Sequence, residues 1–181
     1  MSSPLVLRPL TVDDEAEALA AHEELAADGF DFLLFRPEGE PWADYVARTH
    51  AWSRGEMLEG RLVASDLLVG DVDGVLVGRA SIRHELGNEF LATYGGHVGY
   101  GVRPAFRRRG HAAAMLRGCL TRLADLGVER ALVTCDPDNL GSARVIESCG
   151  GVFDRLQPGS PDHDDAYAVG DKLRYWVPTG V

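Results

Sequence analysis

The chain has few cysteines and no long hydrophobic run. Its three cysteines, Cys119, Cys135 and Cys149, are odd in number, widely spaced and set among apolar residues. That pattern favours reduced, packed thiols over a disulfide framework, and none of the three adjoins a histidine that would activate it as a nucleophile. No window approaches the ~20 apolar residues that a membrane-spanning helix needs. A disulfide scaffold and a membrane-embedded protein are therefore excluded.

Positive charge is also scarce. Lysine and arginine together number 18 against 28 aspartates and glutamates, which gives a formal net charge of −10. This balance disfavours nonspecific binding to nucleic acid, and an acidic surface is compatible with a cationic substrate such as an amine. Residues 1–19 turn acidic where a signal peptide would carry a long apolar stretch, so we expect a cytoplasmic protein.

The patterning contains no internal repeat or low-complexity linker and predicts one domain over residues 1–181. Two apolar runs joined at Asp73-Gly74 indicate a β-hairpin, and a helix is predicted from Pro41 to about Met57. The predicted order of elements is β-α-α-β-β-β-α-β-α-β-β. Antiparallel pairing at the front and a β-α-β unit in the middle indicate a mixed α/β sheet with helices on its faces.

One segment combines glycine with the scarce positive charge. Residues 95–102, GGHVGYGV, predict a strand in which part of the backbone rather than the side chains matters. Pro104 prevents the strand from continuing, three arginines follow, and Gly110 begins a helix. The unpaired N–H groups of a first helical turn and the helix dipole attract anions, and arginine suits phosphate oxygens. The segment therefore predicts a diphosphate site.

Two common nucleotide loops are absent. The sequence has no G-x-x-x-x-G-K-S/T loop, and GYGVRP lacks the third glycine of G-x-G-x-x-G. The alternative interpretations are that the arginines form a solvated charge run or that they bind nucleic acid. The spacing Arg107-x-x-Gly110-x-Ala112, after a strand and at the start of an amphipathic helix, favours the diphosphate site over both.

At these residues the sequence resembles the GNAT superfamily of N-acetyltransferases. RRRGHA, residues 107–112, matches its pyrophosphate motif of Gln or Arg, two variable residues, Gly, one variable residue, and Gly or Ala. TCDPDNLGSARVIESCGG, residues 134–151, looks like the next family segment, a strand followed by an Asn that opens a helix. The two motifs cover roughly residues 97–152, and the whole chain looks like a bacterial subgroup.

The resemblance implies the GNAT fold and a cofactor site. The fold is a mixed, mostly antiparallel sheet of six to seven strands with a V-shaped splay between the fourth and fifth, flanked by about four helices. Acetyl-CoA would lie in the splay as acyl donor, with no metal. The resemblance implies that the backbone at the end of the strand contacts the pantetheine arm, at Tyr100, Gly101 and Val102. The arginine loop would hold the pyrophosphate, with Arg107, Arg108, Arg109, Gly110, His111 and Ala112. The start of the next helix would contact the pantetheine or the sulfur, through Asn139 and Ser142. Asn139 can cap its helix as well.

The residues that many relatives use as acid and base are missing. The position of the usual tyrosine acid is Ile146, and the usual basic positions on the central strand are Gly96 and Val98. His97 lies between the last two and should face the opposite side of the sheet by strand alternation.

The remaining candidates lie mainly at the end of the neighbouring strand, SIRHEL. We predict Glu85 as a base that acts through water, with His84 second. Glu89 and Tyr100 are further candidates, and solvent-exposed charges explain the loop residues equally well.

The sequence thus predicts an enzyme that moves acetyl from acetyl-CoA to a primary amine. The alternative is a non-catalytic acyl-CoA-binding or sensing domain of the same fold, which the missing acid and base support. His163 lies among carboxylates in residues 161–167, and a loop explains this better than a metal site. Tyr175 and Trp176 indicate packing in the core or in a homodimer.

Overall fold

A computed structural model describes residues 4–60, 62–160 and 170–180 of the chain, so the segment around His163 lies outside the described residues. The described strands and helices follow the predicted order of elements, which is confirmed. They are β1 (Val6–Pro9), α1 (Glu15–Ala26), α2 (Trp42–Ser53), β2 (Ser65–Val72), β3 (Val75–Arg83), β4 (Val98–Val102), α3 (His111–Asp125), β5 (Arg130–Cys135), α4 (Leu140–Ser148), β6 (Val152–Gln157) and β7 (Lys172–Pro178), with single turns η1 (Val12–Asp14), η2 (Leu91–Gly95) and η3 (Pro104–Phe106).

The described strands form one mixed sheet in the order β1-β2-β3-β4-β5-β7-β6. The β4–β5 pair is parallel and the other neighbouring pairs are antiparallel. The predicted hairpin joins β2 to β3, where Asp73 (φ 54°) and Gly74 (φ 84°) both adopt the left-handed conformation of a two-residue turn. This sheet is the predicted mixed, mostly antiparallel one.

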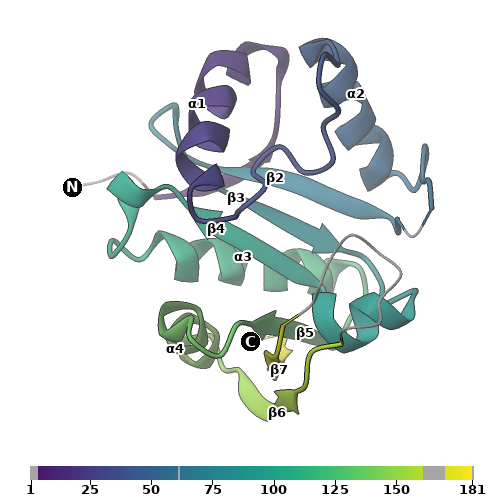
Figure 1. Cartoon of the computed structure of the whole chain (residues 1–181), viewed down its shortest axis with the longest axis vertical. Coiled ribbons are helices and arrows are strands. Elements are labelled where there is room, and N and C mark those ends of the chain that lie inside the picture. The colour runs from purple at the N-terminus through teal and green to yellow at the C-terminus, as the bar shows by residue number, and fades with distance from the viewer. Residues whose placement is uncertain (1–3, 61, 161–169, 181) are drawn as a thin grey trace.

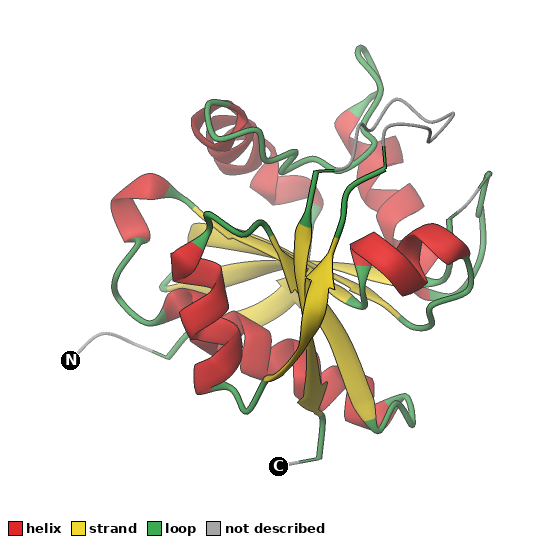
Figure 2. Cartoon of the chain, turned by 60° about the horizontal axis from the view of Figure 1, so that its bottom comes forward, coloured by secondary structure: helices red, strands yellow, loops and turns green. Residues whose placement is uncertain are grey.

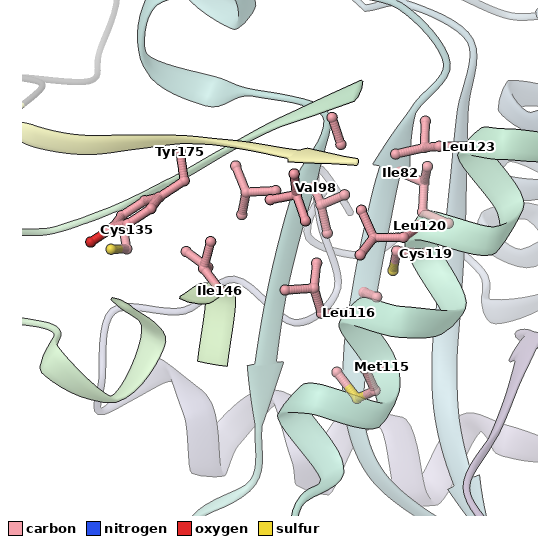
Figure 3. Packing of buried hydrophobic residues seen from close by; sticks show 14 of the residues in the cluster. Ile82, Val98, Met115, Leu116, Cys119, Leu120, Leu123, Cys135, Ile146 and Tyr175 are labelled. Atoms are coloured by element: carbon pink, nitrogen blue, oxygen red, sulfur yellow. The ribbon is translucent and has the colours of Figure 1, made fainter. Parts of the chain in front are cut away.

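Helices cover both faces of the sheet (Figures 1 and 2). α1 and α2 pack on one face over a cluster that includes Leu25, Tyr45 and Leu76. α3 and α4 pack on the other face, where Leu116 and Ile146 are fully buried against Val98 and their neighbours (Figure 3). None of the described helices is long and apolar enough to cross a membrane.

One predicted helix differs in detail from the structure. α2 ends at Ser53, earlier than predicted, because Gly55 adopts φ 74° and Met57 φ 53°, which no helix continues through. Before β4, residues 91–95 form a π-helical turn, η2. The topology is the predicted one.

The splay between β4 and β5 is the feature that positions the site. The two strands pair only where Val98 lies opposite Val133. Just before that pair, Gly96 has φ 65° and lies so close to β5 that a Cβ on it would be 2.5 Å from the carbonyl oxygen of Leu132. Only glycine fits both demands. Gly96 lies just before β4, which begins at Val98 and not at Gly95 as predicted. Beyond Val98 the two strands diverge.

Candidate functional site

A cavity of about 670 Å³ lies between the second half of β4 and the first turns of α3 and α4. Ten of the eleven residues predicted to contact cofactor line it: Tyr100, Gly101, Val102, Arg107, Arg108, Gly110, His111, Ala112, Asn139 and Ser142. Arg109 does not line it; its guanidinium stacks 5.8 Å from the centre of the Phe106 ring. Three elements, β4, α3 and α4, and the loop before α3 thus converge on one cavity.

The N-terminus of α3 opens into this cavity. Gly110 caps the helix with φ 83°, and a Cβ on it would meet no atom within 4 Å. Glycine is therefore required here by backbone conformation and not by crowding inside the protein. The first N–H groups of the helix have no intrahelical acceptor, and the helix dipole adds about half a positive charge to them. This terminus can accept an anion from the cavity.

Arg107 is held in place rather than free. Its Nε donates to the carbonyl oxygen of Val102 at 3.0 Å, and its Nη2 donates to the Asp28 carboxylate. Asp28 and Phe30 belong to the segment between α1 and α2, and both line the cavity. Sequence reasoning missed these two residues because no local motif marks them.

The N-terminus of α4 forms the opposite wall. The Asn139 side chain accepts a hydrogen bond from the Ser142 N–H at 3.0 Å, so it caps the helix as one interpretation predicted. The Ser142 hydroxyl lies 2.9 Å from the hydroxyl of Tyr100 on β4. Burial raises the pKa of Tyr100 to about 12, so the phenol stays protonated at neutral pH. The two hydroxyls form a bridge from β4 to α4.

The three cysteines are free thiols, as predicted. Cys135 ends β5 beside the cavity and is only 7% exposed; burial raises its pKa to about 11. Burial also raises the pKa of Cys119 to about 12. Cys149 packs at the end of α4, with its Sγ 3.8 Å from the carbonyl oxygen of Ala113. The two buried thiols stay protonated at neutral pH, which does not suit a nucleophile.

The predicted proton acceptors lie apart from the cavity. His84 Nε2 is 3.2 Å from the Asp66 carboxylate, which also accepts from Arg122 Nε at 2.8 Å. Glu85 and Glu89 are exposed. None of the three predicted acceptors lines the cavity. The structure therefore brings the predicted cofactor residues together but does not bring Glu85, His84 or Glu89 to them.

The acid and base positions of the resemblance carry no titratable side chain here. Ile146 is fully buried in the core and Val98 is 3% exposed. His97 does not line the cavity and joins the two strands at the base of the splay. Its imidazole Nδ1 accepts a hydrogen bond from the Leu132 N–H at 2.9 Å, and its backbone N–H donates to the Leu132 carbonyl oxygen. Burial, with the nearby charge of Arg83, lowers the pKa of His97 to about 4. The imidazole is therefore a neutral structural acceptor.

Solved acetyltransferases share this architecture. RimL, a ribosomal L7/L12 alpha-N-protein acetyltransferase in complex with coenzyme A, is 16% identical with a TM-score of 0.70, covering 98% of this chain and 95% of its own. The microcin C7 self-immunity acetyltransferase MccE, in complex with acetyl-CoA and AMP, is 14% identical with a TM-score of 0.67 over 97% and 93%. Mycobacterium smegmatis RimJ, in complex with CoA-disulfide, is 20% identical with a TM-score of 0.64 over 98% and 86%. These structural similarities show that the chain has the same fold as these acetyltransferases.

The sequence comparison is more specific. No curated protein matches the chain. The family model of the acetyltransferase (GNAT) domain matches residues 4–152, which include both motifs and every residue that lines the cavity. The chain belongs to the GNAT family of acetyltransferases.

Proposed function

We propose that the chain is an N-acetyltransferase that moves acetyl from acetyl-CoA directly to a primary amine. The observation that carries the proposal is the single cavity that joins the diverging end of β4 to the N-terminus of α3. The bound acetyl-CoA of MccE, a protein of the same fold, supports acetyl-CoA as the donor. The geometry suits a ligand with a diphosphate at one end and an extended arm at the other.

Each part of the ligand has a proposed set of partners. The N–H groups from Arg107 to Ala112 hold the diphosphate, and the exposed guanidinium group of Arg108 pairs with it, with the charge of Arg109 nearby. The pantetheine arm lies along β4 at Tyr100, Gly101 and Val102, as an added strand would. Because β4 pairs with β5 only at Val98, the edge of β4 beyond that residue faces the cavity. A β4 N–H group then stabilises the thioester oxyanion.

The proposed reaction is a direct acyl transfer. The amine nitrogen attacks the thioester carbonyl carbon, the carbon–nitrogen bond forms, and the carbon–sulfur bond breaks. The sulfur leaves with the bonding pair and receives a hydrogen bond from the bridge between Tyr100 and Ser142. A lysine-like amine has a pKa of about 10.4 and must first lose a proton. We keep exposed Glu85 as the proposed acceptor through water, ahead of His84, which faces Asp66.

The assay that tests this function follows thiol release from acetyl-CoA in the presence of an amine library, with calorimetric binding of CoA measured in parallel. Amine-stimulated thiol release supports the enzyme. CoA binding without turnover on any amine would instead support a non-catalytic acyl-CoA-binding domain, the alternative favoured by Gly96, Val98 and Ile146 at the usual acid and base positions. Loss of CoA binding on charge reversal at Arg107 or Arg108, which both line the cavity, would support cofactor binding there.

A further inference from the structure

Arg83 lies on the opposite face of β4 from the Tyr100 hydroxyl, close to the base of the splay. It is the last residue of β3, and its N–H donates to the carbonyl oxygen of His97 at 2.8 Å. Its guanidinium lies over Gly99, where a Cβ would be 3.4 Å from Nη1 and 3.8 Å from Nη2. Gly99 is next to Val98, where β4 and β5 last pair. The guanidinium thus lies beside the end of the splay at which the proposed acetyl transfer takes place.

The charge of Arg83 has no counter-ion among the described residues. No described carboxylate lies within ion-pair distance of it, and no described acceptor takes a hydrogen bond from its guanidinium. Arg8, Arg48, Arg103 and Arg174, which are also partly or fully buried, all pair with carboxylates. Arg79 and Arg36 pair with no described carboxylate, but their guanidinium groups donate to carbonyl oxygens.

Among the described residues, the nearest charged side chain on this face of β3 is another cation, Arg79. Arg79, on the same face, is 3% exposed and donates to Ser81 Oγ at 3.2 Å and to the Phe32 carbonyl at 3.1 Å. The Asp31 carboxylate, near Arg79, accepts from the Phe35 N–H at 3.2 Å. Burial lowers the pKa of Arg83 to about 10, as expected for a desolvated cation that lacks a partner.

An unpaired, half-buried cation is costly unless a ligand offsets its charge. We propose that Arg83 binds an anionic oxygen group, a carboxylate or a phosphate, on the acceptor amine. The guanidinium offers a planar pair of donors that suits both groups. This inference rests on the proposed acetyl transfer and narrows its acceptor to amines that carry a negative charge.

Matched pairs of acceptors test the proposal. The pairs are 4-aminobutyrate against butylamine, 2-aminoethyl phosphate against ethanolamine, and seryl-glutamate amide against seryl-glutamine amide. For the wild-type protein, kcat/KM from thiol release is expected to favour the anionic member of at least one pair. Arg83→Gln should lower that value by about 10- to 100-fold, the range of a charged hydrogen bond, and leave the neutral member unchanged. Arg83→Lys should keep part of the preference.

A matched control separates this role from a general effect of charge. Arg117 is exposed on α3, and Arg117→Gln removes the same charge away from the splay. It should change neither member of a pair. Because Arg83 has no described partner, Arg83→Gln should not lower the thermal unfolding temperature, whereas loss of a structural arginine would. An equal fall in kcat for both members would overturn the proposal and assign Arg83 to the reacting carbonyl instead.

A binding experiment distinguishes this proposal from acetyl transfer itself. Thermal unfolding of the CoA-bound protein is followed with N-acetyl-4-aminobutyrate and with neutral N-butylacetamide. Stabilisation by the anion alone, lost in Arg83→Gln, supports the anion site even if no amine is turned over, which would count against acetyl transfer only. Turnover that is equal for anionic and neutral amines, with no selective stabilisation, would overturn the anion site and leave acetyl transfer standing.

Discussion

At the scale of single residues, the hydroxyl of Tyr100 is the clearest proton donor in the cavity. Its bond to Ser142 at 2.9 Å and its raised pKa keep it protonated across neutral and moderately alkaline pH. Tyr100→Phe should therefore lower kcat by about 10-fold or more, with little change in CoA affinity, because the departing sulfur loses a donor. Steady-state kinetics and calorimetry of CoA binding measure the two effects. Unchanged kcat would remove Tyr100 from the proposed mechanism.

His97 makes the stability of the protein depend on pH. Its pKa is about 4 in the folded state against 6.5 in the unfolded chain, so between these values the unfolded chain binds the extra proton. The stabilisation from the neutral ring is complete above pH 6.5 and is lost as pH falls towards 4, by up to about 3 kcal/mol. Urea unfolding at pH 7 and pH 5 of wild type and His97→Asn measures it. A pH dependence that is the same in both proteins would contradict this assignment.

At the scale of elements, both ends of α3 depend on glycine, but only one end faces the cavity. Gly110 and Gly127 have φ of 83° and 81°, and a Cβ on either meets no atom within 4 Å. Alanine at each should cost about 1–2 kcal/mol of stability from backbone strain. Only Gly110→Ala should also weaken CoA binding, because its methyl group projects where the diphosphate is proposed. Comparison of the two variants by calorimetry tests this, and equal CoA affinities would contradict the site.

Arg103 attaches the end of β4 to α1. Only 8% exposed, it donates to Glu24 at 2.9 and 2.6 Å, to Glu17 at 2.5 Å and to the Leu76 carbonyl at 2.9 Å. Arg103→Gln should lower the free energy of unfolding by about 2 kcal/mol, because the two glutamates are partly exposed and water compensates part of the loss. Urea unfolding against the exposed control Arg117→Gln measures the difference. A loss no greater than in the control would show that the contacts contribute nothing to stability.

At the scale of the whole molecule, local patterns predicted the order of elements, and the resemblance to the GNAT superfamily predicted the splay and ten of the residues that line the cavity. The hairpin turn, the helix start at Gly110 and the cap at Asn139 each depend on a few adjacent residues. The pairing of distant side chains is not local: Asp28 binds Arg107, and Asp66 lies against His84. Such contacts depend on where the folded chain brings each acid.

The lack of a described partner for Arg83 could not be predicted from the sequence either, because it too depends on contacts between distant parts of the chain. Its place in the strand is visible from sequence, since Arg79, Ser81 and Arg83 alternate onto one face. The absence of a carboxylate beside it among the described residues becomes visible only when the surrounding elements are in place.

The meeting of β4 and β5 has a mechanical consequence. Among the described residues, the two sections of the sheet, β1–β4 and β5–β7, are joined by the Val98–Val133 pair and by the contacts of His97 with Leu132 and of Tyr94 with Thr134. A pantetheine arm along β4 would occupy the edge of β4 that does not pair with β5. CoA binding should therefore connect the two sections of the sheet reversibly. Amide hydrogen exchange at Tyr100–Val102 and along β5 should slow on CoA binding, while the β2–β3 hairpin stays unchanged. The protein would then be stiffer with CoA bound than without it.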